Sequence, residues 1–336
     1  MFTIIIYISS ALLFLSILTY LIPLIYQNYL SSRRDVRKTL RIFPSRRNNN
    51  NNKQATTLRK TYSVEWALVT GSSSGIGKAI ASRLASAGIN VVIAAYSDEH
   101  LPSAVSSLRK KYPSVKFLQV GVDLSDPVKA LSTLSAATKD LRIRFLVNNA
   151  GYLKTGFFSS QSLSSLVSNV NVNAVSVIHI THHYLRKMQQ LPPLANGKRG
   201  AIAFTSSPAF LMPCPFSSMY GSTKAFLTEF ATSLAPEVRC DGIDVTVVHP
   251  SPVATNFYQG AHKLDAIEFF KSTATGPERI ADVCLDSVGK CVVRDQGYYP
   301  ILLRILLKLV DVNFISEIIA LTAHRMKDFR AARKGD

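Results

Sequence analysis

The chain has 336 residues, 47% of them hydrophobic, so it can bury a substantial core and is not disordered as a whole. Its formal net charge is +18, but residues 31–60 carry ten Lys and Arg against one acid, which argues against a basic nucleic-acid-binding face. The four cysteines form no CxxC pair, which excludes a dense disulfide framework and is typical of a reducing compartment.

Residues 1–30 are predicted to form a transmembrane anchor. No charged side chain occurs before Arg33, and the apolar run exceeds the roughly 20 residues that a bilayer core requires. A cleaved signal peptide is the alternative, but the uncharged start fits it poorly. The Lys/Arg cluster that follows favours the cytosolic face. We therefore expect a membrane-anchored protein, in the endoplasmic reticulum, whose catalytic domain faces the cytosol.

Residues 31–61 are predicted to be a basic, asparagine-rich cytosolic linker. The run Asn48–Asn52 has no apolar content to bury. The basic cluster either binds anionic lipid headgroups or acts only as a topology signal.

Residues 62–296 alternate short apolar runs with helical segments, as in βαβ units. The predicted strands are 66–70, 90–95, 116–122, 144–149, 200–206 and 244–250. The first helix is expected over 75–88, with Gly88 at its C-terminal cap. Apolar strands without alternation belong in a sheet that is covered on both faces. We therefore predict one α/β domain with a Rossmann-type, doubly wound parallel sheet.

A glycine-rich turn joins the first predicted strand to the first helix. In "VTGSSSGIGKAI", Gly71, Gly75 and Gly77 occupy this turn. Glycines let the backbone approach a pyrophosphate closely, and a helix N-terminus offers free N–H groups. A tight turn is the simpler reading, but the strand–turn–helix context favours nucleotide binding.

Several further motifs follow at ordered spacings. They are Asp123-Leu124, Asn148-Asn149-Ala150-Gly151, Ser207, and Tyr220-x-x-x-Lys224. Together with the glycine turn, they resemble the short-chain dehydrogenase/reductase family over about residues 64–255. The chain departs from the family pattern at Ser251, which follows Pro250 where a glycine is usual.

This resemblance implies a nicotinamide cofactor and a set of contact residues. An active-site asparagine is implied at Asn173, although Asn171 is a near neighbour. The resemblance also implies the following cofactor contacts: Thr70, Gly71, Ser72, Ser74, Gly75, Ile76, Gly77, Tyr96, Asp123, Leu124, Asn149, Ala150, Gly151, Tyr220, Lys224, Pro250, Val253 and Thr255. Members of the family often dimerise through helices equivalent to 174–190 and 218–235, so a homodimer is one expected assembly.

The catalytic chemistry is predicted to rest on Tyr220, Lys224 and Ser207. Reduction of a ketone needs a hydride, which the cofactor supplies, and a proton, which the protein supplies. Tyr220 is the candidate acid, and Lys224, one turn away, is a cation that favours ionisation of the phenol. Ser207 would hydrogen-bond the substrate oxygen. By resemblance, Lys224 also binds the nicotinamide ribose and Asn173 holds a water that relays protons.

The residues at the end of the second strand favour NADP(H) over NAD(H). An acid there would bind the ribose hydroxyl and reject a 2′-phosphate, but Ala95 and Tyr96 stand at these positions. Asp98 and Glu99 lie close by and weaken the preference. The trio His179, His182 and His183 has a spacing that fits a metal, but hydride transfer needs none, so no metal site is expected.

Residues 297–336 are predicted to be an apolar or amphipathic segment that either lies on the membrane or packs against the domain. Arg304, Lys308, Asp311 and Glu317 interrupt it, which argues against a second span. With the anchor, this segment favours a hydrophobic small-molecule substrate and contact with membrane lipid. The resemblance is greatest to beta-ketoacyl-CoA reductases and hydroxysteroid dehydrogenases, so reduction of a fatty acyl or steroid ketone is predicted. The alternatives are a retinol, steroid or sphingoid-base oxidoreductase and a tethered, non-catalytic nucleotide-binding scaffold.

Overall fold

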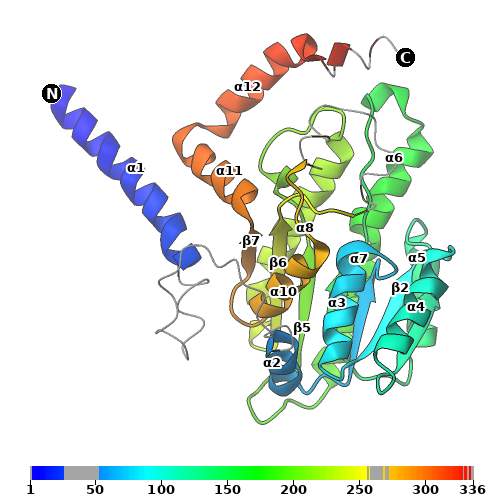
Figure 1. The fold of residues 1–336 in the computed structure, drawn as a ribbon. Coiled ribbons are helices and arrows are strands. Elements are labelled where there is room, and N and C mark those ends of the chain that lie inside the picture. Colours follow the sequence, from blue (N-terminus) through cyan, green and yellow to red (C-terminus); the bar gives the residue numbers. More distant parts are fainter. Residues whose placement is uncertain are drawn as a thin grey trace.

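The structure is a computed structural model, and it describes residues 2–25, 53–255, 257, 268, 272–327, 329–330 and 333. Seven parallel strands form one sheet in the order β3-β2-β1-β4-β5-β6-β7 (Figure 1). Their bounds are β1 Trp66–Thr70, β2 Asn90–Ala95, β3 Phe117–Gly121, β4 Ile143–Asn148, β5 Gly200–Thr205, β6 Ile243–Pro250 and β7 Val293–Gln296. The predicted Rossmann-type parallel sheet is confirmed. The sequence analysis missed β7 because "VRDQ" is short and polar.

The direction of strand addition reverses between β1 and β4. The chain moves outward from β1 to β2 and β3, then returns to place β4 on the other side of β1. In open parallel sheets, the crevice at such a switch point lies outside the carboxyl ends of the strands and binds ligands.

Helices cover both faces of the sheet. One face is covered by α2 (Lys53–Tyr62), α3 (Gly75–Ser86), α4 (His100–Lys111) and α10 (Pro277–Ser287). The other is covered by α5 (Pro127–Ala137), α7 (Ser176–Gln190) and α8 (Ser218–Arg239). Side chains of β1 alternate between the two cores: Ala67 and Val69 face the first, and Leu68 faces the second. Burying such a side chain fully stabilises the fold by about 1.5–3 kcal/mol.

Helix α2 corrects the predicted linker. Residues 53–61 were expected to be part of a linker over 31–61, but they are helical, whereas residues 31–52 lie outside the described residues. Ala55, Leu58 and Tyr62 share one face of α2 and are buried against the domain. The Tyr62 hydroxyl donates to Asp244 Oδ2 at 2.5 Å. The spacing of these three residues, rather than the overall polarity of the segment, decides its structure.

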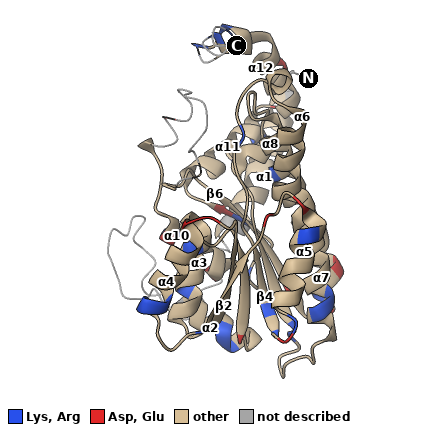
Figure 2. Ribbon diagram, turned by 90° about the vertical axis from the view of Figure 1, so that its right-hand side faces the viewer, with Lys and Arg blue, Asp and Glu red and all other residues tan. Residues whose placement is uncertain are grey.

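Large apolar side chains are exposed on three helices at one end of the molecule: α1 (Phe2–Ile25), α11 (Tyr298–Leu309) and α12 (Val312–Thr322) (Figure 1). Charged side chains are more frequent on α2 and α4, whose last turns carry Arg59 and Lys60 and Arg109, Lys110 and Lys111, respectively (Figure 2). The most exposed apolar side chains of the three helices include Tyr7, Leu12, Phe14, Leu302, Phe314 and Leu321.

Within the described residues, one helix meets the length and hydropathy of a membrane span, and it is not α1. This helix is Leu163–Gln190, which joins α6 (Leu163–Val170) to α7 and has 39% of its apolar window buried in the domain. In α1, Ile6–Ile22 forms an apolar helical stretch that is shorter than such a span.

Candidate active site

A cavity of about 1050 Å³ lies at the carboxyl ends of the strands. Its walls come from the β1–α3 turn, the ends of β2, β4, β5 and β6, and the start of α8. It therefore occupies the crevice that the reversal of strand order creates.

The glycine turn forms one wall of the cavity and packs closely against neighbouring residues of the protein. Gly71 and Gly75 have φ values of +63° and +52°, a region that L side chains rarely adopt. A Cβ on Gly71 would lie 2.8 Å from Ala150 Cα. Ser74 precedes α3 and makes no side-chain capping bond, so the first N–H groups of α3 keep their capacity to bind an anion. This cradle fits a dinucleotide.

Most of the predicted cofactor contacts line this cavity. They are Gly71, Ser74, Gly75, Ile76, Tyr96, Asp123, Leu124, Asn149, Ala150, Gly151, Tyr220, Lys224, Pro250, Val253 and Thr255. Thr70, Ser72 and Gly77 do not line it. Their positions beneath the turn point to a different role.

Thr70, Ser72 and Asn149 fasten the glycine turn to the sheet. Thr70 Oγ1 accepts from the backbone N–H groups of Asn149 (3.0 Å) and Ala150 (3.1 Å). The Asn149 amide donates to the Thr70 carbonyl at 3.1 Å, and Ser72 Oγ donates to the Val69 carbonyl at 2.7 Å. These polar groups are satisfied within the protein, so they shape the cradle. Gly77 lies so close to Gly71 that a Cβ would fall 2.2 Å from the Gly71 carbonyl oxygen.

The end of the cavity beside β2 and β3 is bordered by Ala95, Tyr96 and Asp123. Asp123 Oδ1 accepts from Ser125 N–H at 2.8 Å. Asp98 Oδ1 accepts from the backbone N–H groups of His100 and Leu101 at the start of α4. Asp98 is therefore committed to the helix start and is not among the residues that line the cavity.

Ser207, Tyr220 and Lys224 meet at the other end of the cavity. Ser207 Oγ accepts from Ala209 N–H at 3.2 Å, an arrangement that orients the hydroxyl and leaves its proton for donation. Tyr220 and Lys224 are one turn apart on α8, with Lys224 Nζ 5.7 Å from the Tyr220 ring centroid.

Lys224 is a buried cation. It is 3% exposed, and its Nζ donates to the Thr205 carbonyl at 2.9 Å. Burial disfavours the charged form and lowers the pKa of Lys224 to about 8. The ammonium is therefore close to its titration point near neutral pH.

Asn173 lies behind the cavity and does not line it. It belongs to the π-helical turn η4 (Asn171–Val175), a rare element that is frequent at functional sites. Its Oδ1 accepts from Tyr152 N–H and its amide donates to the Tyr152 carbonyl, each at 3.0 Å. Asn171, the predicted rival, instead donates to the Ser125 carbonyl. Gly151 separates Asn173 from Lys224, and a Cβ there would approach both.

The cavity also has an apolar wall, most of which sequence reasoning missed. This wall includes Met212, Phe216, Phe257, Tyr299, Leu303 and Met326. The apolar residues of 251–300 predict either a lid over a hydrophobic substrate or ordinary helix core; Phe257 lines the cavity, whereas 256, 258–267 and 269–271 lie outside the described residues. The contribution of α11 had no local motif to reveal it. Ser251 also lines the cavity, and its buried Oγ has no hydrogen-bond partner among the described residues.

Known proteins resemble this chain in sequence and in fold. The family model "short chain dehydrogenase" matches residues 65–264. Hydroxysteroid dehydrogenase-like protein 1 of Gallus gallus is 31% identical over 70% of this chain and 68% of its own length. Very-long-chain 3-oxoacyl-CoA reductase-A of Danio rerio is 33% identical over 70% of each chain.

Two solved structures have the same fold. The structure of a 7beta-hydroxysteroid dehydrogenase superposes with a TM-score of 0.65 at 27% identity, covering 76% of this chain and 95% of that one. A short-chain dehydrogenase from Sphingobium yanoikuyae in complex with NADPH gives a TM-score of 0.61 at 26% identity, covering 69% and 87%.

Proposed function

We propose that this chain, which belongs to the short-chain dehydrogenase family and is an oxidoreductase, reduces a ketone on a lipid-like substrate with NADPH. The observation that carries the proposal is the meeting of Ser207, Tyr220 and Lys224 in one cavity with the glycine turn. A non-catalytic scaffold would have no need of all three groups.

When bound, the nicotinamide supplies the hydride. Gly71, Gly75 and the start of α3 would hold its pyrophosphate, since both glycines line the cavity and the start of α3 offers N–H groups. Ser207 would donate its free hydroxyl proton to the carbonyl oxygen of the substrate and so stabilise the negative charge that develops there.

Tyr220 would give its phenolic proton to the same oxygen and act as the general acid. The buried ammonium of Lys224, close to the Tyr220 ring, would favour the phenolate that remains. Asn173 would act from behind Gly151. There its two hydrogen bonds to the Tyr152 backbone would fix the segment of chain that separates it from Lys224.

NADPH is proposed over NADH on two observations. Ala95 and Tyr96 border the cavity where an acid would reject a 2′-phosphate, and Asp98 is committed to the start of α4. Several structural relatives are complexes with NADPH or NADP, and one is a complex with NAD. A ratio of kcat/KM for NADPH over NADH below one would contradict the preference.

A substrate dissolved in the membrane is proposed from the apolar wall and the exposed helices. Tyr299 and Leu303 line the cavity from α11, and Leu302 and Leu306 of the same helix are exposed. The 24-residue α1 is about 36 Å long at 1.5 Å per residue, enough to cross a hydrocarbon core. We therefore propose a membrane anchor over residues 1–30, a catalytic domain over 62–296 and a membrane-associated segment over 297–336, at the cytosolic face of the endoplasmic reticulum.

The test is turnover by the purified full-length protein and its Tyr220→Phe variant. NADPH oxidation is followed with a long-chain 3-oxoacyl-CoA, a ketosteroid, a sphingoid ketone and a retinoid aldehyde. Loss of a general acid should lower kcat by about 100-fold or more. Tyr152→Phe is the matched control, because this phenol lines the same cavity but donates to Ser168. Undiminished turnover by Tyr220→Phe would exclude the mechanism.

A further inference from the structure

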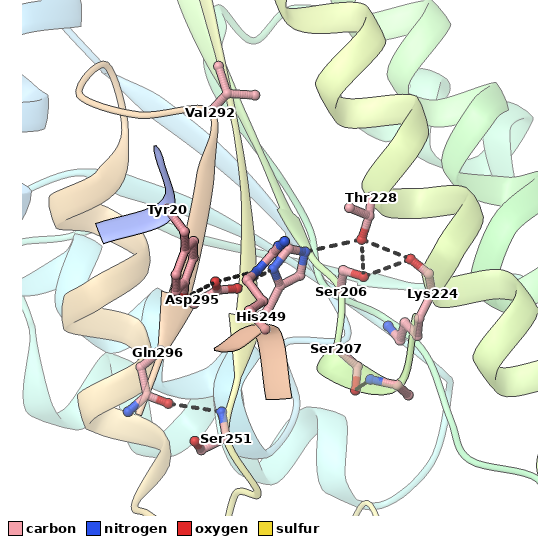
Figure 3. Close-up of polar contacts among 12 residues, drawn as sticks. Tyr20, Ser206, Ser207, Lys224, Thr228, His249, Ser251, Val292, Asp295 and Gln296 are labelled. Atoms are coloured by element: carbon pink, nitrogen blue, oxygen red, sulfur yellow. Dashed lines mark hydrogen bonds and ion pairs between the residues drawn. The ribbon is translucent and has the colours of Figure 1, made fainter. Parts of the chain in front are cut away.

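A buried polar network lies behind the cavity and connects the N-terminal helix to the catalytic helix (Figure 3). Its centre is Asp295 on β7, whose side chain is 4% exposed. Asp295 Oδ2 accepts from the Tyr20 hydroxyl of α1 at 3.0 Å and from Arg304 Nε of α11 at 2.6 Å. Asp295 Oδ1 lies 2.8 Å from Nδ1 of His249, which is wholly buried at the end of β6. One carboxylate therefore joins four elements.

The partners of Asp295 determine the direction of the hydrogen bonds. Burial alone would raise the pKa of Asp295, but the bond from His249 and the charge of Arg304 lower it below its usual value. An ionised carboxylate only accepts, so His249 Nδ1 carries a proton and donates it. Burial lowers the pKa of His249 despite the bond to Asp295, which keeps the imidazole neutral. The other ring nitrogen, Nε2, is then an acceptor.

The network ends on the backbone of Lys224. Thr228 Oγ1 lies within hydrogen-bonding distance of two acceptors, His249 Nε2 at 3.1 Å and the Lys224 carbonyl oxygen at 3.0 Å, and its one proton serves one of them at a time. Ser206 Oγ lies 2.8 Å from both Thr228 Oγ1 and the Lys224 carbonyl oxygen, and it also donates to this carbonyl. The ammonium of Lys224 is held by the carbonyl of Thr205. Thr205 and Ser206, which are consecutive at the end of β5, thus hold the ammonium and the backbone carbonyl of Lys224.

Aromatic rings enclose the network on the side of α1 and α11. The Arg304 guanidinium lies 5.3 Å from the Phe210 ring centroid and 5.9 Å from that of Tyr20. Phe210 in turn lies 4.6 Å from the His249 ring. A helix that served only as a tether would need no hydroxyl bonded to a buried carboxylate.

We propose that Tyr20, Asp295 and His249 are positioning residues, through which the seating of the N-terminal helix holds Lys224 in its working place. The apolar α1 is then part of the catalytic unit as well as an anchor. This inference rests on the proposed function, because it assigns a consequence for turnover to the placement of Lys224. Displacement of a catalytic group by about 1 Å can cost about 100-fold in rate.

The experiment uses the full-length protein in phosphatidylcholine nanodiscs and compares Tyr20→Phe with Tyr7→Phe. Tyr20→Phe removes the hydroxyl but keeps the ring beside Arg304, whereas Tyr7 is 72% exposed on the same helix. Tyr20→Phe should lower kcat about 5- to 10-fold with the KM of the ketone unchanged, since Lys224 is only slightly displaced. Tyr7→Phe should match the wild type.

A second pair of variants separates positioning from general loss of structure. His249→Gln keeps a donor for Asp295 and an acceptor for Thr228, whereas His249→Leu keeps neither. Glutamine should retain at least about three times the kcat of leucine when both are assayed well below their melting temperatures. Equal kcat values for this pair, or a wild-type kcat for Tyr20→Phe, would overturn the proposal.

The two hypotheses fail in different ways. If the wild type reduces none of the ketones, the proposed function fails, and the inference is then tested by NADPH binding, followed by nucleotide fluorescence. Tyr20→Phe should then weaken NADPH binding about 3-fold relative to Tyr7→Phe, because Lys224 lines the cofactor cavity. Equal dissociation constants would overturn the inference independently of turnover.

Discussion

Ser206 and Ser207 are adjacent at the end of β5, yet their hydroxyls serve opposite sides of the site (Figure 3). Ser206 is 3% exposed, and its Oγ bonds to the Lys224 carbonyl and Thr228 on α8. Ser207 Oγ accepts from Ala209 N–H and keeps its proton. The comparison shows that bonding inside the protein, more than residue type, separates a group that supports the site from a group that can act on a ligand.

The same distinction separates the cavity wall that contains Ser207 and Tyr220 from the polar network behind it. The wall of Ser207 and Tyr220 presents groups to the cavity, whereas the region behind it, from Ser206 to Asp295, consists of groups bonded to one another. Substitutions of the groups presented to the cavity should therefore change turnover with little effect on stability. Substitutions behind should change both.

The largest difference is expected for Ser207→Ala. Removing a hydrogen-bond donor to a developing oxyanion typically lowers kcat by about 100-fold. The melting temperature should stay close to that of the wild type, because the only bond lost within the described residues is the one from Ala209 N–H. Steady-state kinetics and a thermal melt of the same preparation provide the test. A large fall in melting temperature would contradict the comparison.

The converse is expected for Ser206→Ala. This change removes a buried bond to the Lys224 carbonyl and one to Thr228, so the free energy of unfolding should fall by about 2 kcal/mol. Because Lys224 loses part of its support, kcat should fall by about 10-fold at most, less than for Ser207→Ala. Denaturant unfolding provides the measurement. A free energy of unfolding equal to that of the wild type would show that the network does not stabilise the fold.

The sequence was sufficient to predict that Tyr220, Lys224 and the glycine turn lie at the cavity, because the information that places them is local. Tyr220 and Lys224 are one helical turn apart, and the glycine turn lies directly between a strand and a helix. Short segments with fixed spacing carry their geometry with them. The strand bounds 66–70 and 90–95 were predicted for the same reason, since continuous apolar runs mark buried parallel strands.

The network behind could not be predicted, because its members are distant in sequence. Asp295 is 46 residues from His249 and 275 from Tyr20, and β7 was not recognised as a strand. Nor does residue type reveal where a side chain bonds. Thr70 and Ser72 were expected to contact the cofactor, but their hydroxyls are used inside the protein. Only the fold decides which polar groups are satisfied internally.

The smallest expected effect is a pH dependence of stability that arises from Lys224, which lines the cavity and is also bonded to the network behind it. Its pKa is lowered from 10.5 to about 8 by burial, so between these values the unfolded chain binds more protons than the folded one. The stability of the cofactor-free protein should therefore rise with pH over this window. Relative to Lys224→Met, whose neutral side chain lacks this titration, the gain from pH 7.5 to 9.5 should be on the order of 1 kcal/mol.

Chemical unfolding at the two pH values, in wild type and variant, isolates this titration, because the other titrating groups are common to both proteins. Equal pH slopes would mean that Lys224 keeps an ordinary affinity for its proton. The buried carbonyl of Thr205 would then compensate fully for the lost solvation. In that case the ammonium would stay charged across the neutral range, and Lys224 would act on Tyr220 as a fixed cation rather than one poised to titrate.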